Sequence, residues 1–327
     1  MLKTLGFIFI FFVATSVISQ EIYKQKASLM GSDFEITVVA NSKLEAEQNI
    51  QIAINEISRI EALISSWDPN SETSRINQNA GIAPVKISEE LFMLIKRALQ
   101  ISSLTDGAFD ISYASMDKIW KYDGSMKKMP TKEAIKNSVA KVGYGSVILD
   151  QINTTVFLKN KAMKIGFGAI GKGYAADQAK KLLISKGISG GIINASGDMN
   201  TWGTQPKAKA WQVAITNPLN KNKAFAVLPI KGAVVTSGNY EKFVTFNNVR
   251  FSHIIDPRSG YPAFGIISVT VFAAQAELAD ALATSVFVMG VQAGLDRINQ
   301  LNGVECIIIT DTGSIKTSKN ITLNTQQ

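Results

Sequence analysis

Met163-Lys164-Ile165-Gly166-Phe167-Gly168-Ala169-Ile170-Gly171-Lys172-Gly173-Tyr174 is the stretch that says most about the fold. Its apolar start, Met163 to Ile165, predicts a strand, and its glycines predict a turn. A helix is expected next, from about Tyr174 to Ser185, with Gly187 as its stop. The apolar run from Gly191 to Ile193 then predicts another strand. The stretch therefore predicts a unit of strand, glycine loop, helix and strand.

The glycines of this stretch match the dinucleotide-binding fingerprint, which lies between a strand and a helix. That fingerprint also needs an acidic residue about twenty positions later to hold a ribose, and residues 186–189 have none. The stretch also approaches a P-loop, but Gly173 cannot supply the hydroxyl that a P-loop gives to Mg²⁺. Two interpretations stay open. The amides near the helix start, with Lys172 beside them, suit a phosphate or a metal, or the glycines serve only tight packing.

Outside this stretch, strand and helix patterns alternate along the chain. Further strands are predicted at 34–39, 147–149, 155–158, 211–215, 224–229, 233–235, 242–246, 249–255 and 268–272. Further helices are predicted at 44–64, from Leu91 to before Thr105, from Thr131 to Val139, at 276–289 with a stop at Gly290, and at 292–299. This order predicts an α/β or α+β fold, with mixed sheets flanked by helices.

Residues 1–19 have the profile of a signal peptide, because Lys3 precedes an apolar run from Leu5 to Ile18 that contains no acidic residue. Val17 and Ser19 are small enough for cleavage after Ser19, and the segment has no cysteine that could accept a lipid. An uncleaved membrane anchor is the alternative, because the run is near the short limit for a spanning helix. In both cases we expect the remaining chain to lie outside the cytoplasm.

The composition indicates a folded protein with a large core, since 46% of the 327 residues are hydrophobic and 18% are charged. Cys306 is the only cysteine and lies in an apolar run that predicts a buried strand, so the chain can form no internal disulfide or thiolate metal cluster. The net charge of +8 comes from scattered lysines without interleaved aromatics, which argues against a nucleic-acid partner. A basic field would still favour a doubly charged dinucleotide.

Asp280 and Thr284 are four residues apart in a predicted helix, so they project from one face about a turn apart. A carboxylate and a hydroxyl are hard oxygen ligands, and Mg²⁺ takes few protein ligands. The alternative is a solvated Asp and a Thr bonded to its own helix. The neighbours are apolar, however, and an unpaired Asp would be costly to bury among them.

His253 is the only histidine, in a predicted strand that runs into a turn at Asp256-Pro257. Histidine is the side chain whose ordinary pKa lies near neutrality, so His253 is either a general base or a hydrogen-bonded structural residue. A single histidine excludes most zinc hydrolases, and the absence of a Cys-His pair argues against a thiol enzyme.

Taken in order, several blocks resemble the ApbE family, the FAD:protein FMN transferases. The blocks are Met30-Gly31-Ser32, Ser65-Ser66-Trp67-Asp68-Pro69 to Arg75-Ile76-Asn77, Thr105-Asp106-Gly107-Ala108-Phe109-Asp110, Gly171-Lys172-Gly173-Tyr174-Ala175-Ala176-Asp177, Asn194-Ala195-Ser196-Gly197-Asp198, Thr236-Ser237-Gly238, Ser252-His253-Ile254-Ile255-Asp256-Pro257 and the helix from Asp280 to Thr284. The resemblance covers nearly all of residues 20–327 and implies a two-lobed single catalytic domain.

The resemblance also implies the roles of individual residues. The FAD site would be lined by Met30, Trp67, Ala108, Phe109, Asp110, Lys172 and Ile254. Mg²⁺ would be bound by Asp280, Thr284 and the carbonyl of Ala169, with Asp280 and His253 as the catalytic residues and His253 as the general base. Gly166 stands where the family usually has an Asp, and Trp67 where many relatives have a Tyr. The first difference should remove a flavin contact, while Trp67 keeps an aromatic face for stacking.

The activity that the resemblance implies is Mg²⁺-dependent cleavage of FAD, with attachment of FMN to a Ser or Thr of a target protein and release of AMP. The expected target is a membrane-associated redox subunit, and the expected location is the bacterial periplasm. Two alternatives use the same site: an FAD pyrophosphatase that gives free FMN and AMP, and a flavin carrier without chemistry.

Overall fold

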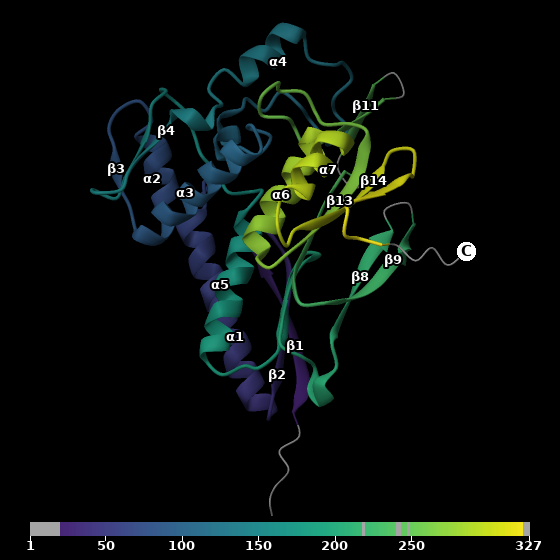
Figure 1. Ribbon diagram of the computed structural model, residues 1–327. Helices are drawn as coiled ribbons and strands as arrows, with labels where there is room; N and C mark the ends of the chain where they lie inside the picture. Colours follow the sequence, from purple (N-terminus) through teal and green to yellow (C-terminus); the bar gives the residue numbers. More distant parts are fainter. Residues whose placement is uncertain (1–19, 218–219, 240–242, 247–248, 323–327) are drawn as a thin grey trace, which may run out of the picture.

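The computed structural model describes residues 20–217, 220–239, 243–246 and 249–322 (Figure 1). The predicted signal peptide, residues 1–19, lies outside these ranges. Among the described residues, no helix has both the length and the apolar character needed to cross a membrane.

An eight-stranded sheet forms the centre of the fold, and each pair of neighbours in it is antiparallel. Neighbours such as β1 and β2, or β6 and β7, are joined by two residues, and turns this short link only antiparallel strands. In spatial order the strands are β1 (Glu21–Leu29), β2 (Ser32–Ala40), β6 (Gly191–Ala195), β7 (Asp198–Trp202), β10 (Gly232–Gly238), β13 (Ile266–Ala273), β14 (Glu305–Thr310) and β15 (Ile315–Thr317).

Four helices form a layer against this sheet in the order of the strands beneath them. Helix α1 contacts β1 and β2, α5 contacts β6 and β7, α6 contacts β10 and β13, and α7 contacts β14. Helices α1 and α5 lie side by side, and α6 continues the layer (Figure 1). The bounds are α1 (Lys43–Ile64), α5 (Gly171–Ser185), α6 (Ala276–Met289) and α7 (Val291–Asn299).

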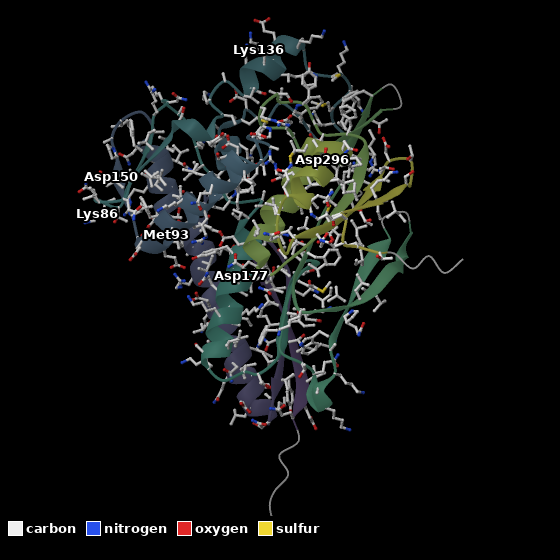
Figure 2. The ribbon with its side chains drawn as sticks, viewed as in Figure 1. Lys86, Met93, Lys136, Asp150, Asp177 and Asp296 are labelled. Carbon is white, nitrogen blue, oxygen red and sulfur yellow. The ribbon has the colours of Figure 1, made fainter. Side chains whose placement is uncertain are left out.

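The remaining elements lie around this core. A three-stranded sheet has the order β3 (Val85–Lys86), β5 (Thr155–Leu158) and β4 (Val147–Asp150), and Lys86 and Asp150 mark its outer edge in Figure 2. Near it lie α2 (Glu72–Gln78) and α3 (Glu89–Leu104), with α4 (Lys132–Ser138) at the top of Figure 1. Two hairpins complete the fold, β8 (Trp211–Asn217) with β9 (Asn220–Ile230) and β11 (Phe243–Phe246) with β12 (Val249–Ser252).

Helix α1 shows how the sequence pattern produces the layer. The Ser42 side chain caps the helix by accepting a hydrogen bond from the Glu45 amide (3.2 Å). The buried side chains recur every three or four residues and include Ile50, Ile57 and Ile60. Burial of each isoleucine contributes about 1.5–3 kcal/mol, so packing on the sheet stabilises this helix more than its cap does.

The predicted α/β or α+β class is confirmed, and the antiparallel pairing is that of an α+β protein. The predicted helices are present, although α5 begins at Gly171 rather than near Tyr174. Strand β12 ends at Ser252, so His253 lies just beyond it and not within a strand reaching Ile255. The sequence patterns did not reveal β1, β3, β7, β15 or α2.

The strand predicted at Met163 to Ile165 is wrong. The Asn77 side chain bonds both the amide (2.8 Å) and the carbonyl (3.0 Å) of Ile165. The Ser115 hydroxyl does the same for Lys164, at 2.7 Å to the amide and 2.8 Å to the carbonyl. Because side chains satisfy these main-chain groups, the segment joins no sheet, and the glycine loop does not belong to a parallel strand-helix-strand unit.

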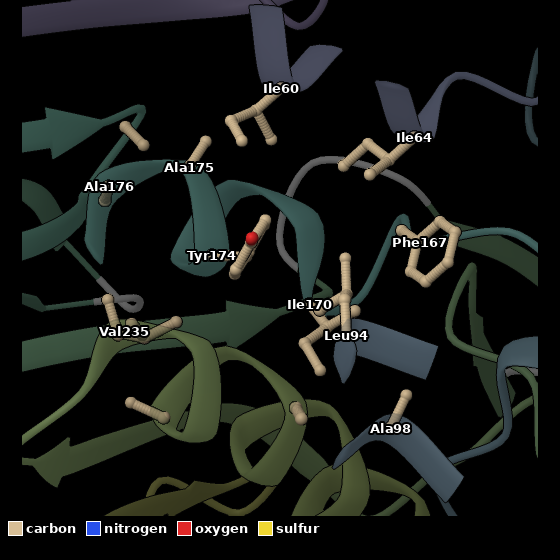
Figure 3. Close-up of a cluster of buried hydrophobic side chains, with 14 of the residues drawn as sticks. Ile60, Ile64, Leu94, Ala98, Phe167, Ile170, Tyr174, Ala175, Ala176 and Val235 are labelled. Atoms are coloured by element: carbon tan, nitrogen blue, oxygen red, sulfur yellow. The ribbon is translucent and has the colours of Figure 1, made fainter. Parts of the chain in front are cut away.

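The glycine loop is held by the hydrophobic core. Phe167 and Ile170 belong to the same buried cluster as Tyr174 (Figure 3). The Tyr174 hydroxyl donates a hydrogen bond to Glu90 of α3 (2.8 Å), which ties α5 to α3. Apolar and polar contacts together therefore fix the position of the loop from which α5 starts.

Helices α5 and α6 are joined by direct hydrogen bonds. The Asp177 carboxylate, between the two helices in Figure 2, accepts hydrogen bonds from the amides of Ala276 (3.0 Å) and Glu277 (2.9 Å). These bonds cap α6, whose own N-cap residue Gln275 makes no such bond. In addition, the Gly173 amide donates to Asp280 (3.1 Å). The position of Asp280 is therefore set by α5.

We predict that Gly173→Ala destabilises the protein by about 1–3 kcal/mol, because a Cβ atom there would lie 2.2 Å from the main-chain oxygen of Ala276 and force the helices apart. The matched control is Gly145→Ala, since a Cβ at Gly145 meets nothing within 4 Å. Chemical unfolding measures both variants. Equal free energies of unfolding for the two would contradict the close approach of the helices.

Candidate active site

A cavity of about 890 Å³ lies where the glycine loop, α6 and the segment after β12 converge. Other parts of its wall come from the loop after α1, from residues 108–122 and from the ends of β7 and β10. This volume is typical of sites for small molecules and cofactors. Segments far apart in the sequence thus build one site.

The structure brings together all but two of the residues proposed from the sequence. Those that line the cavity are Trp67, Ala108, Phe109, Asp110, Ala169, Lys172, His253, Ile254, Asp280 and Thr284. The other two, Met30 and Gly166, are not among its lining residues. The terminal methyl of Met30 lies close to Gly171, and Gly166 is buried beneath Ala114. Met30 therefore packs against the glycine loop from outside the cavity, and Gly166 is the buried start of that loop.

Asp280 is a buried carboxylate at the inner end of the cavity. Burial, together with the negative charge of Asp198, raises the pKa of Asp280 to about 7, while Lys172 opposes the shift. Lys172 forms an ion pair with Asp198, whose pKa burial also raises. The direct bond from the Lys172 ammonium favours the charged form of Asp198 and opposes the effect of burial on that carboxylate.

The polar groups in this corner fit a small divalent cation. Asp280 and Thr284 share one face of α6, and the Ala169 carbonyl belongs to the adjoining loop; all three line the cavity. Carboxylate, hydroxyl and carbonyl oxygens are the ligands that Mg²⁺ prefers, with water or phosphate in its remaining positions. No cluster of three or more His, Cys, Asp or Glu side chains suited to a metal occurs in the described ranges, which leaves a sparse, mixed donor set.

Trp67 presents an aromatic face at the cavity, and its side chain is 81% exposed. The Lys118 ammonium lies 4.4 Å from the centre of its ring, a cation–π contact. An exposed aromatic face of this size is suited to stacking against a planar heterocycle.

Asp110 combines lining of the cavity with a structural role. Its carboxylate accepts hydrogen bonds from the Ser112 amide (2.7 Å) and the Tyr144 amide (2.8 Å), and burial raises its pKa above the usual value. These bonds fix the 3-10 helix at Ile111–Ser115, which forms part of the cavity wall.

His253 lines the cavity beside Tyr122, whose ring meets it edge-on at 6.4 Å between ring centres. Among the described residues, the Tyr122 hydroxyl is one of the few buried polar atoms without a hydrogen-bond partner. Burial raises the pKa of Tyr122, so the phenol stays neutral. Tyr122 therefore positions the imidazole through its ring and not through its hydroxyl.

We predict that Tyr122→Phe increases the free energy of unfolding by about 1 kcal/mol, because it removes a buried hydroxyl that has no partner in the described structure. The ring, and with it the packing on His253, is kept. Tyr174→Phe is the matched control and should destabilise the protein, since it removes the hydrogen bond between the Tyr174 hydroxyl and Glu90. Thermal unfolding measures the stability of both variants. A loss of stability in Tyr122→Phe would show that the Tyr122 hydroxyl makes a hydrogen bond.

Sequence reasoning gave no role to several residues that line the cavity, including Asp198, Lys118 and Tyr113. Asp198 stands at the start of an otherwise uncharged strand, β7, and this isolated charge was the available signal. Lys118 and Tyr113 belong to a segment without periodic pattern, and nothing local to it indicates that it forms a cavity wall.

Known proteins similar to this chain are ApbE proteins. Residues 30–308 match the sequence profile described as the ApbE family. An FAD:protein FMN transferase of Klebsiella pneumoniae (strain 342) is 31% identical over 90% of this chain and 91% of the relative. One of Escherichia coli (strain K12) is 29% identical over 89% of this chain and 83% of the relative.

The fold is similar as well. The crystal structure of the ApbE protein from Thermotoga maritima aligns with a TM-score of 0.82 and 31% identity, over 91% of this chain and 97% of that chain. Sequence and structure agree over most of the length of both partners, and the matched region contains every element that lines the cavity. The chain therefore belongs to the ApbE family.

Proposed function

We propose that this chain, an FAD:protein FMN transferase, cleaves FAD in the cavity and attaches the FMN half to a Ser or Thr hydroxyl of another protein. One observation carries the assignment of the site: a single cavity holds the only histidine of the chain, the oxygen donors of α6 and the glycine loop, and an exposed tryptophan face. Base, charge-binding groups and a stacking surface are the parts that such a transfer requires.

The cavity wall provides complementary contacts for a dinucleotide. The exposed face of Trp67 suits stacking against one of the two ring systems. Lys118 and Lys164 line the same cavity and can approach the phosphates, while Lys172 is already paired with Asp198 at its inner end. Orientation by such contacts supplies much of the rate in phosphoryl transfer, because the reacting atoms need to be aligned.

The proposed metal site comprises Asp280, Thr284 and the Ala169 carbonyl. A Mg²⁺ ion bound there would neutralise negative charge on the pyrophosphate. The chain's own contribution is to hold these oxygens in place through the Gly173 amide and the Asp177 cap of α6.

His253 is the proposed general base. Its imidazole would take the proton of the acceptor hydroxyl as that oxygen bonds to the FMN phosphorus. The bond from this phosphorus to the oxygen of the AMP phosphate breaks, and AMP leaves with the electron pair. The products are a phosphoester between FMN and the target protein, and free AMP.

In-gel flavin fluorescence distinguishes the possible functions. The protein is incubated with FAD, Mg²⁺ and a candidate target, and we expect a fluorescent target band and AMP. Free FMN and AMP without a labelled target would indicate an FAD pyrophosphatase. Binding of FAD with neither product would indicate a flavin carrier.

The proposed target is a membrane-associated redox subunit outside the cytoplasm, reached after export through residues 1–19. The support is the sequence of that segment and the basic charge of the chain. Mass spectrometry of the chain purified from the periplasm should find an N-terminus after Ser19. An intact Met1 would favour the uncleaved membrane anchor instead.

A further inference from the structure

Tyr113 lies directly over the glycine loop and lines the cavity. A Cβ atom built on Gly168 would be 2.4 Å from the Tyr113 hydroxyl oxygen, and one on Gly166 would be 3.8 Å from it. Gly168 is therefore required by the phenol above it, because any larger residue would have to displace that oxygen. The tyrosine is 39% exposed, so a ligand in the cavity can reach it.

Tyr113 and the loop are held together by bonds on both sides. The Gly166 amide donates to the Ile111 carbonyl (2.9 Å), and the Ser115 hydroxyl bonds both main-chain groups of Lys164. Ile111 and Ser115 are the ends of the 3-10 helix that carries Tyr113. These bonds hold the 3-10 helix against the loop, and they place the Tyr113 ring above Gly168.

The surroundings of the hydroxyl place it beside the proposed phosphate and metal groups. Its oxygen accepts a hydrogen bond from the Gly168 amide. Burial raises the pKa of the phenol, and the negative charge of nearby Asp280 raises it as well. The next loop residue is Ala169, whose carbonyl belongs to the proposed metal site. Within the described residues the phenol makes no hydrogen bond as a donor to the protein. Its proton can therefore be donated into the cavity, to solvent or to an oxygen of a bound ligand.

We propose that the Tyr113 hydroxyl contacts the substrate and donates a hydrogen bond to a pyrophosphate oxygen of the bound dinucleotide. The proposal rests on the proposed function in one respect, that FAD occupies this cavity. A hydrogen bond to a charged oxygen is stronger than one to a neutral group. Tyr113 thereby adds a neutral donor to a site whose other phosphate-binding groups are lysines and the metal ligands.

Tyr113→Phe tests the proposal because it removes the hydroxyl and keeps the ring. With Mg²⁺ present, we expect the dissociation constants of FAD and ADP to rise roughly tenfold to a hundredfold. Riboflavin, which has no phosphate, should bind as in the wild type. Riboflavin weakened as much as FAD would overturn the phosphate contact, and so would unchanged binding of all three ligands.

Tyr174→Phe is the matched control, since its hydroxyl bonds Glu90 outside the cavity. It should lower the melting temperature and leave the FAD dissociation constant unchanged. Tyr113→Phe should lose FAD affinity, and its melting temperature should fall by no more than that of Tyr174→Phe, since only the hydrogen bond from the Gly168 amide is lost. A larger fall in melting temperature, together with FAD and riboflavin affinities that weaken alike, would assign the hydroxyl a structural role and overturn the proposal.

A double-mutant cycle tests the geometry independently. Gly168→Ala should weaken FAD binding in the wild type, because the new Cβ displaces the Tyr113 oxygen. In the Tyr113→Phe background it should cost little more, since the nearest ring carbon of Tyr113 is 3.6 Å from that Cβ, an ordinary contact. Losses that simply add would show that Gly168 and the hydroxyl act separately, against the proposal.

Binding and transfer distinguish this proposal from the proposed function. If the wild type binds FAD but labels no target, the transferase assignment fails, while the effect of Tyr113→Phe on the dissociation constants still decides the role of the hydroxyl. If transfer occurs and Tyr113→Phe binds FAD and ADP normally, only the role of Tyr113 is refuted.

Discussion

Asp280→Ala is expected to abolish Mg²⁺-dependent cleavage of FAD and to leave the fold intact. Asp280 is the only charged group of the proposed donor set, which otherwise consists of the Thr284 hydroxyl and the Ala169 carbonyl. A metal supplies several kcal/mol of charge stabilisation in such reactions, so the rate should fall on the order of a thousandfold or more. A variant that kept most of its activity would refute the metal assignment.

Asp280→Asn makes the test sharper, because an amide oxygen can still accept the hydrogen bond from the Gly173 amide. We expect titration calorimetry to detect Mg²⁺ binding, in the presence of ADP, for the wild type and not for this variant. This readout is independent of activity. Calorimetric binding equal to that of the wild type would place the ion elsewhere.

The pH dependence of stability gives a second signature of the buried carboxylate in metal-free protein. Burial raises the pKa of Asp280 from the usual 3.8 to about 7, so the folded state binds the proton more tightly than the unfolded state. This contribution to stability is complete below the lower value and is lost as the pH rises through the upper one. The Asp280→Asn variant has no ionisable carboxyl group at this position. In chelator, the variant should therefore gain stability relative to the wild type between about pH 4 and pH 8.

Periodic patterns predicted the helices well, because each helix buries one face, and apolar residues every three or four positions mark that face in the sequence. Helix α6 was predicted with its observed bounds, which also placed Asp280 and Thr284 on one face. The strand at Met163 to Ile165 failed for a nonlocal reason. The Asn77 and Ser115 side chains make hydrogen bonds with its main chain. No local sequence pattern indicates which distant side chains will make such bonds.

For the candidate site as well, the sequence indicated some residues, and others became evident only from contacts in the fold. Blocks that resemble a known family indicated residues such as Trp67 and His253, and the structure places these in one cavity. Tyr113 and Asp198 gained their interest only from contacts across the fold: the phenol lies over Gly168, and the carboxylate pairs with Lys172. Neither contact can be inferred from the spacing of residues in the sequence.

His253→Asn is expected to slow transfer by on the order of a hundredfold to ten-thousandfold, the usual share of a positioned general base. Asparagine keeps a polar group of similar reach but cannot take a proton near neutral pH. FAD binding should survive, because the imidazole is one of many groups in the cavity wall. Fluorescence titration of the flavin measures binding, and a single-turnover transfer assay measures the rate.

The contrast between binding and rate separates a base from a structural histidine. His253 packs against the Tyr122 ring, and a histidine needed only for this contact would lower stability, binding and rate together. Tyr122→Phe, which keeps the contact, is the control and should transfer FMN at the wild-type rate. Rates measured from about pH 5.5 to 8.5 bracket an ordinary imidazole, and the wild-type rate should rise with pH as the base loses its proton. A wild-type rate that stayed flat over this range, beside an Asn variant of equal speed, would exclude His253 as the base and leave the reaction to positioning of the phosphates.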